Sequence, residues 1–163
     1  MSGRGRTLAD IGELATIERI SRIFQSGSDV IQGIGDDCAV VRMNAKATHD
    51  LLLTSDPVIE GTHFDGKASA RAIGHKAVAR VISDIAAMGG EADWGLLNLV
   101  APPTTPVERL DGIIHGAATT AEKHGMKIVG GDTAQGPVLE VHAFAVGRVK
   151  AGGAVLLSGA TPG

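Results

Sequence analysis

Five aspartates stand beside glycines or at expected strand ends, and their side chains suit a hard cation. They occur in four short segments that lie far apart in the chain: Gly33–Asp37, Thr54–Asp56, Ser83–Gly89 and Gly130–Thr133. Mg2+ prefers oxygen ligands and is usually bound together with a phosphate, and glycine lets the backbone approach such a phosphate closely. The sequence therefore predicts a magnesium and phosphate site assembled from distant segments.

Each segment also has an ordinary structural interpretation. Asp36 and Asp37 repel each other and would be stabilised by a cation, but a solvated turn would also accommodate them. Asp84 is expected near a helix end, where its charge opposes the helix dipole; the alternative to a cation is an ion pair with Arg80 one turn earlier. Asp132 follows two glycines and could be a simple turn residue. The agreement of four segments on one chemistry favours the metal site.

The second segment joins two hydroxyls to a carboxylate. Thr54 and Ser55 precede Asp56 at an expected strand end, an arrangement that suits magnesium, while the alternative is a turn aspartate before Pro57. His63 follows in an irregular loop. It is interpreted as a phosphate or substrate contact, with a structural loop histidine as the alternative.

Composition limits the classes of function. The 163 residues carry a net charge of −3, which argues against non-specific nucleic-acid binding. Aromatic residues make up 2%, too few for base-stacking surfaces, and the single cysteine, Cys38, excludes an internal disulfide. Residues 1–7 lack the apolar stretch of a signal peptide, and the apolar runs are too short to span a bilayer. We expect no membrane partner and a cytoplasmic location.

Periodicity predicts interleaved helices and strands. A helix over residues 11–25 is expected to be capped by Asp10, and another to begin with Thr105 as cap and Pro106 at its first position. The remaining expected elements are strands at 38–43, 51–55, 95–101, 127–129 and 138–146 and a helix over 69–88. The first two strands are too close in sequence for a crossover helix. The predicted class is α+β, with a mixed sheet and helices packed on one face.

The segments together resemble the N-terminal domain of thiamine-monophosphate kinase, in the superfamily related to aminoimidazole ribonucleotide synthetase. The resemblance covers residues 11–163. It rests on Gly33–Ala39, Thr54–Asp56 with Glu60–Phe64, Lys76–Ala77 with Ser83–Gly89, and Gly130–Thr133.

The resemblance implies a synthetase-like fold whose sheet pairs into a barrel across a homodimer, with ATP along the interface. It implies in-line transfer of the ATP γ-phosphate to thiamine monophosphate, without a covalent enzyme intermediate. It also implies a flexible tail at 1–10, an ATP- and magnesium-binding domain at 11–148, and the start of a linker at 149–163. The implied metal ligands are Asp37, Asp56, Asp84, Asp132, Thr54 and Ser55; Gly131 and Asp132 would contact nucleotide and His63 the substrate.

Three departures from the family pattern leave alternatives open. The sequence covers about half of the family's length, Leu157 stands where a basic residue is usual, and Pro57 stands where threonine is more frequent. One alternative is another ATP-dependent activating enzyme of the superfamily. The other is a non-catalytic dimerisation module that kept the fold.

Overall fold

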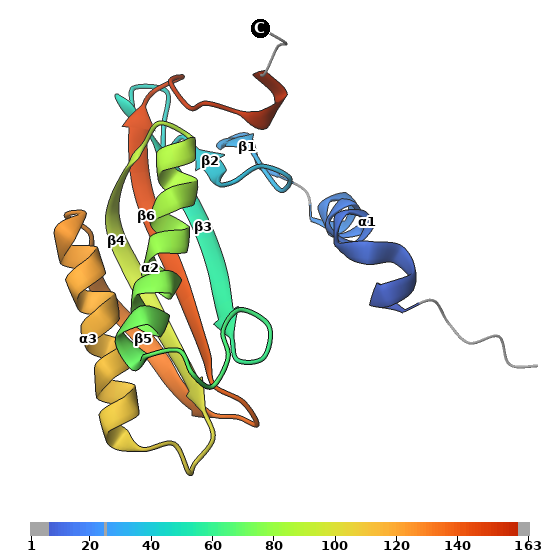
Figure 1. The fold of residues 1–163 in the computed structure, drawn as a ribbon. Coiled ribbons are helices and arrows are strands. Elements are labelled where there is room, and N and C mark those ends of the chain that lie inside the picture. Colours follow the sequence, from blue (N-terminus) through green and yellow to red (C-terminus); the bar gives the residue numbers. More distant parts are fainter. Residues whose placement is uncertain (1–6, 25, 160–163) are drawn as a thin grey trace, which may run out of the picture.

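The structure, a computed structural model, describes residues 7–24 and 26–159 as one sheet with helices (Figure 1). The elements are α1 (Leu8–Ile23), β1 (Val30–Gln32), β2 (Ala39–Val41), β3 (His49–Ile59), α2 (Ala70–Ala87), β4 (Glu91–Ala101), α3 (Val107–Lys123), β5 (Lys127–Gln135), β6 (Glu140–Lys150) and the 3-10 helix η1 (Leu157–Gly159). The sheet has six strands in the order β1-β2-β3-β6-β4-β5. Only the β4–β5 pair is parallel among these neighbours. The predicted α+β class with a mixed sheet is confirmed.

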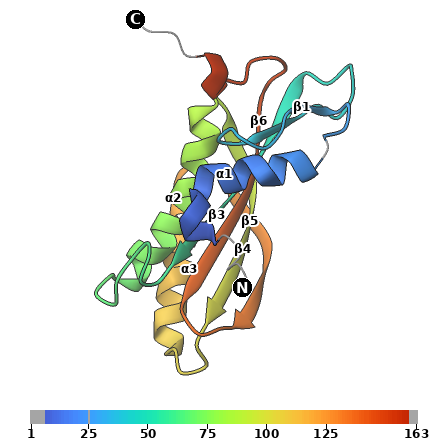
Figure 2. The same cartoon turned by 90° about the vertical axis from the view of Figure 1, so that its right-hand side faces the viewer.

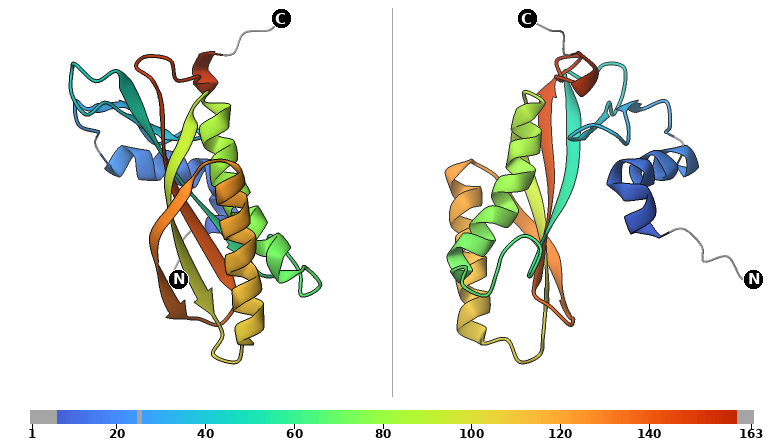
Figure 3. Two further views of the ribbon diagram at one scale, coloured as in Figure 1. Left: turned by 90° about the vertical axis from the view of Figure 1, so that its left-hand side faces the viewer. Right: turned by 45° about the vertical axis from the view of Figure 1, so that its right-hand side comes forward.

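Helices α2 and α3 lie side by side on one face of the sheet, here called the covered face (Figure 3). Strand β6 shows the alternation that this layering requires, because Val141, Ala143 and Ala145 are buried under the helices while Phe144 between them is 37% exposed. The helix predicted at 69–88 is observed as α2, and its apolar residues at helical spacing, from Ile73 to Met88, are buried. The other side of the sheet is called the open face.

Glycines allow the two helices to approach closely. A Cβ atom on Gly74 of α2 would lie 1.9 Å from the carbonyl oxygen of Ile113, and one on Gly116 of α3 would lie 2.1 Å from that of Arg71. Neither contact is possible for a larger residue, since real Cβ atoms do not come within 3.0 Å of such atoms. None of the described helices is both long and apolar enough to cross a membrane.

The first helix differs from the prediction and from the rest of the fold. Thr7, not Asp10, is its N-cap residue, and Asp10 accepts hydrogen bonds from the backbone N–H and hydroxyl of Thr7. Gly12, at φ 77°, interrupts the helix with a kink. Figure 2 shows α1 in front of the open face, and it contacts no other described element. Of the tail expected at 1–10, residues 1–6 lie outside the described residues, as do Gln25 and residues 160–163, whereas residues 8–10 belong to α1.

Strand β3 is longer than predicted and does not stop at Asp56. It continues through Pro57 to Ile59, paired with β6 along its whole length. Strand β2 pairs with β3 only at Leu51–Leu53, so the later part of β3 has one described neighbour. A residue without an N–H group is tolerated on such an edge.

Two other boundaries also correct the prediction. Strand β5 extends from Lys127 to Gln135, so Asp132 lies within a strand rather than in a turn. Pro106 is itself the N-cap of α3, and no side-chain capping hydrogen bond forms there, so the predicted Thr105 cap is wrong. The helix ends at the C-cap His124, and the following Gly125 has the positive φ of 72° that is typical of a glycine after a helix.

Candidate functional site

The site begins where β3 faces the last turns of α2. Thr54 and Asp56 occupy alternate positions of β3 that point to the covered face, in register with the buried Ala145 and Ala143. The Thr54 hydroxyl donates a hydrogen bond to Asp84 Oδ2 of α2 at 2.8 Å. Two predicted segments, 30 residues apart, are therefore in direct contact.

The third segment is the loop at Gly33–Asp37, here called the glycine loop. The backbone N–H of Cys38 donates to Met88 Sδ at 3.1 Å, which fixes the loop to the C-terminal end of α2. Asp37 is thereby close enough to act on the charge of Asp84. We call Asp37, Thr54, Asp56 and Asp84 the acid cluster.

The charges of the acid cluster are not fully compensated. Burial raises the pKa of Asp84 above its ordinary value; the hydrogen bond from Thr54 and the charge of Arg80 oppose this rise, while Asp56 and Asp37 add to it. Burial together with the charges of Asp84, Asp37 and Asp36 raises the pKa of the Cys38 thiol to about 12. Negative charges that disfavour one another in this way create a local potential that a cation would relieve.

The donor set of the acid cluster fits magnesium in its chemistry. Every side chain in it offers carboxylate or hydroxyl oxygen, the ligand type that Mg2+ prefers. Among the described residues, no three His, Cys, Asp or Glu side chains lie close enough together to hold an ion in this conformation. Since Mg2+ keeps several waters and needs only one or two carboxylates besides phosphate, the acid cluster fits an ion brought in with a nucleotide.

Arg80 interacts with a different partner from the one suggested by its spacing. The sequence offered an Arg80–Asp84 pair as the alternative to a metal, but Nη2 of Arg80 donates to Asp56 Oδ1 across to β3, at 2.8 Å. Within the described part of the chain, Nε of Arg80 is a buried side-chain nitrogen without a hydrogen-bond partner. The guanidinium is therefore only partly satisfied by its present contact.

Ser55 and Asp132 lie on the other side of the sheet. Ser55 alternates with Thr54 and is in register with the exposed Phe144, and Asp132 is in register with Asn98 of β4. Strands β6 and β4 separate β3 from β5, which places Asp132 roughly 14 Å from β3. The structure thus brings Asp37, Thr54, Asp56 and Asp84 together and leaves Ser55 and Asp132 outside that group.

Gly131 has a steric reason to be glycine. Its φ is 156°, and a Cβ atom there would lie 1.9 Å from the carbonyl oxygen of Leu97. The next residue, Asp132, accepts a hydrogen bond on Oδ1 from the N–H of Thr133 at 2.8 Å, and both residues are exposed. The backbone of this segment and the carboxylate of Asp132 are therefore accessible at the edge of the sheet.

His63 lies in the loop after β3 and faces α2. Its Nδ1 accepts a hydrogen bond from the N–H of Ile59 at 3.1 Å, so the proton of the neutral ring lies on Nε2. Its carbonyl oxygen accepts from Nζ of Lys76. Lys76 precedes Asp84 by two turns, roughly 12 Å along the helix. His63 therefore contacts α2 about two turns before Asp84 and is not part of the acid cluster.

The described hollows are not centred on the acid cluster. An apolar groove of about 500 Å³ lies between α3 and β5, lined by Leu97, Ile114 and Ile128 among others, and none of its lining residues belongs to the acid cluster. The groove has no acidic ligand set suited to metal and phosphate. The carboxylates, rather than this groove, therefore define the candidate site.

With this geometry, the sequence can be placed among known proteins. Residues 35–149 match the family described as AIR synthase related protein, N-terminal domain. The chain belongs to this family.

Relatives within it include thiamine-monophosphate kinase from Salmonella typhimurium, 35% identical over 93% of this chain and 46% of the relative, and that from Corynebacterium glutamicum, 34% identical over 89% and 42%. The solved structure of AaThiL complexed with AMPPCP and TMP is similar with a TM-score of 0.81 and 30% identity, over 91% of this chain and 45% of that chain. The chain spans about half the length of the curated relatives it matches.

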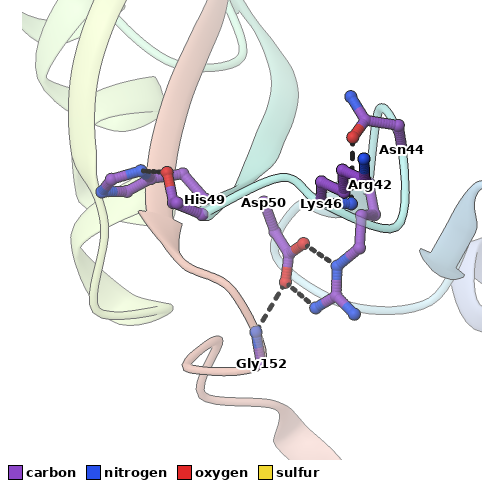
Figure 4. A network of polar contacts seen from close by, with 7 residues as sticks. Arg42, Asn44, Lys46, His49, Asp50 and Gly152 are labelled. Atoms are coloured by element: carbon purple, nitrogen blue, oxygen red, sulfur yellow. Dashed lines mark hydrogen bonds and ion pairs between the residues drawn. The ribbon is translucent and has the colours of Figure 1, made fainter.

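A second aspartate of β3 was missed by sequence reasoning, although it shapes this AIR synthase-related domain. Asp50 is 1% exposed and receives hydrogen bonds from Nε and Nη2 of Arg42, at 2.6 and 2.8 Å, and from the N–H of Gly152 at 2.8 Å (Figure 4). Its alternation with Leu52 on the covered face was the available signal. The prediction started the strand at Leu51 and so left Asp50 in a turn.

Asp50 also anchors the segment that returns to the acid cluster. After Gly152, the N–H of Val155 donates to the carbonyl of Met88 at 3.1 Å, and the N–H of Leu157 donates to Asp36 Oδ2 at 3.1 Å. The segment from Ala151 to Leu157 is therefore attached in turn to β3, to the end of α2 and to the glycine loop. These contacts hold the glycine loop in place beside Asp84.

Proposed function

We propose that this chain is the magnesium- and ATP-binding N-terminal half of a thiamine-monophosphate kinase-like phosphotransferase. The observation that carries the proposal is the contact of Thr54 with Asp84 beside Asp56 and Asp37, because it joins three distant oxygen-rich segments into one acidic site. Relatives named thiamine-monophosphate kinase and the AaThiL structure with AMPPCP and TMP support the choice of nucleotide and acceptor.

In this proposal the residues divide into two groups that meet the nucleotide from different sides. Asp37, Thr54, Asp56 and Asp84 would hold Mg2+ from the covered face. A bound Mg2+ would neutralise the charge on the phosphates and orient them for in-line transfer. The protein contributes positioning, since phosphoryl transfer needs little covalent chemistry from side chains.

Ser55, Gly131 and Asp132 would act at an interface with a second copy. The open face exposes Leu53, Trp94, Leu96 and Phe144, each by 37% or more of its surface. Apolar side chains gathered on one face are typical of an interaction surface. We propose a homodimer that covers this face, so that the nucleotide contacts of Gly131 and Asp132 and the oxygen of Ser55 lie along the interface.

His63 is proposed to contact the phosphate-bearing substrate. Its Nδ1 is already used by the backbone of Ile59, which fixes the ring and leaves Nε2–H as the donor. A donor at the edge of a magnesium and phosphate site can bind a phosphate oxygen. The fixed ring would give that contact a defined direction.

The test is calorimetric titration of the chain with ATP, with and without Mg2+, and then with thiamine monophosphate. Magnesium-dependent binding that is lost in Asp84→Asn and retained in Asp111→Asn, an exposed carboxylate on α3, supports the proposal. Binding that ignores both magnesium and Asp84 overturns it.

A second candidate is the non-catalytic dimerisation module. The Arg80–Asp56 contact favours it, because a carboxylate already paired with an arginine has less need of a metal. A folded dimer that binds no nucleotide at millimolar ATP and Mg2+ would establish this second candidate in place of the first.

A further inference from the structure

The guanidinium of Arg80 occupies the place in the acid cluster where a cation is expected. Arg80 and Asp84 are four residues apart on α2 and therefore share one side of the helix. Instead of closing on Asp84, the side chain reaches across to Asp56 on β3 at 2.8 Å, while Asp84 is hydrogen-bonded by Thr54. Its charge still acts on both carboxylates.

This contact is less complete than the Arg42–Asp50 pair, in which two nitrogens of the guanidinium donate to the carboxylate. Arg80 makes one hydrogen bond to Asp56, and its buried Nε has no partner among the described residues. Buried hydrogen-bond donors in folded proteins nearly always have a partner. The side chain also remains 39% exposed, so the charged head can turn to water without unfolding the helix that carries it.

We infer that Arg80 is a tethered cation that competes with the divalent ion for Asp56. The inference rests on the metal assignment proposed above. When the ion enters, the guanidinium must leave Asp56, so the net charge around the carboxylates changes less than it would in a site without an arginine. The domain would therefore bind the bare ion weakly, and Arg80 is a positioning residue of the site rather than a ligand.

The test is Mn2+ binding to the full 163-residue chain, measured by the loss of the free-ion signal in electron paramagnetic resonance. Arg80→Met keeps the apolar stem and removes the charge. Because a partly exposed ion pair is weak, we expect Mn2+ to bind about tenfold more tightly to this variant. Arg71→Met removes the same charge from an exposed position about nine residues earlier on α2 and is expected to leave the affinity unchanged.

Two further variants separate the possible outcomes. Arg80→Gln repeats the test if the methionine variant does not fold, and Asp56→Asn should weaken Mn2+ binding in the wild-type background. If Asp56→Asn weakens binding but neither Arg80 variant strengthens it, the competition is overturned while the metal site stands. If no variant binds bare Mn2+, the inference about Arg80 fails, whereas the metal assignment is tested separately by the magnesium-dependent ATP titration described above.

Discussion

Two aspartates on the same face of β3 are each paired with an arginine, and the pairs differ in completeness. Asp50 is 1% exposed and accepts three hydrogen bonds, two of them from Arg42. Asp56 is 20% exposed and accepts one from Arg80, whose Nε is unsatisfied. The first pair is built for stability, whereas the second leaves lone pairs and charge available for a ligand.

The same contrast is visible in the pKa shifts. The hydrogen bonds from Arg42 lower the pKa of Asp50, because they outweigh its burial. At Asp84, beside Asp56, burial has the larger effect and raises the pKa. A carboxylate whose charge is favoured by the fold supports the fold, and one whose charge is disfavoured is a candidate for external cations.

The largest effect is expected from Asp84→Asn. Mg2+-dependent ATP affinity should fall about a hundredfold, since the oxygen ligand that we propose for Mg2+ and the Thr54 contact are both altered. The free energy of unfolding should be unchanged or higher at neutral pH. Because the folded-state pKa is raised, this carboxylate's contribution to stability falls as pH rises between its usual and its raised pKa. A variant that melts lower and binds ATP normally would reverse the assignment.

Asp50→Asn should have the opposite effect: it should lower the stability of the fold rather than the affinity for ATP. Loss of a buried, charge-assisted acceptor is expected to lower the free energy of unfolding by about 2 kcal/mol, measured by urea denaturation. The stability that Asp50 provides is complete above the usual carboxyl range and is lost as pH falls through its lowered pKa, so the difference from wild type should shrink in acid. Asp56→Asn is the matched control and should cost less stability.

Asp132→Asn should weaken ATP binding about tenfold without changing stability, because Asp132 is exposed and hydrogen-bonds only its neighbour among the contacts described. Equilibrium sedimentation compares the mass of this variant with that of the wild type, which we propose is a homodimer. If ATP affinity is unaffected while Asp84→Asn abolishes binding, the covered face alone forms the site.

The smallest effect is expected from Leu157→Arg. Leu157 is 63% exposed, and its N–H donates to Asp36 beside the acid cluster. The interaction of one added surface charge with ATP is weak, so ATP affinity should rise only about threefold. Calorimetry at low salt and again at high salt measures this change. Leu157→Gln serves as the uncharged control, and an equal gain there would rule out a charge effect.

Much of the fold was predictable because helices α2 and α3 and strands β4 and β6 repeat apolar residues at regular intervals. The errors at strand ends lie where pairing, not propensity, decides the boundary. Pro57 predicts a strand end, yet β3 continues along β6. The glycines at 130 and 131 predict a turn, yet β5 continues along β4. In both cases tertiary hydrogen bonds outweigh the local preference.

By itself, the sequence determined which residue types can bind metal and phosphate, because carboxylates, hydroxyls and glycines are visible in it. Only the tertiary structure decided how they are grouped. The alternation of β3 puts Thr54 and Asp56 on the covered face and Ser55 on the open face, and two strands separate Asp132 from them. The tertiary structure also pairs Arg80 with Asp56 rather than with Asp84. Such partners are chosen by side-chain direction and distance across the sheet, which no local spacing in the chain specifies.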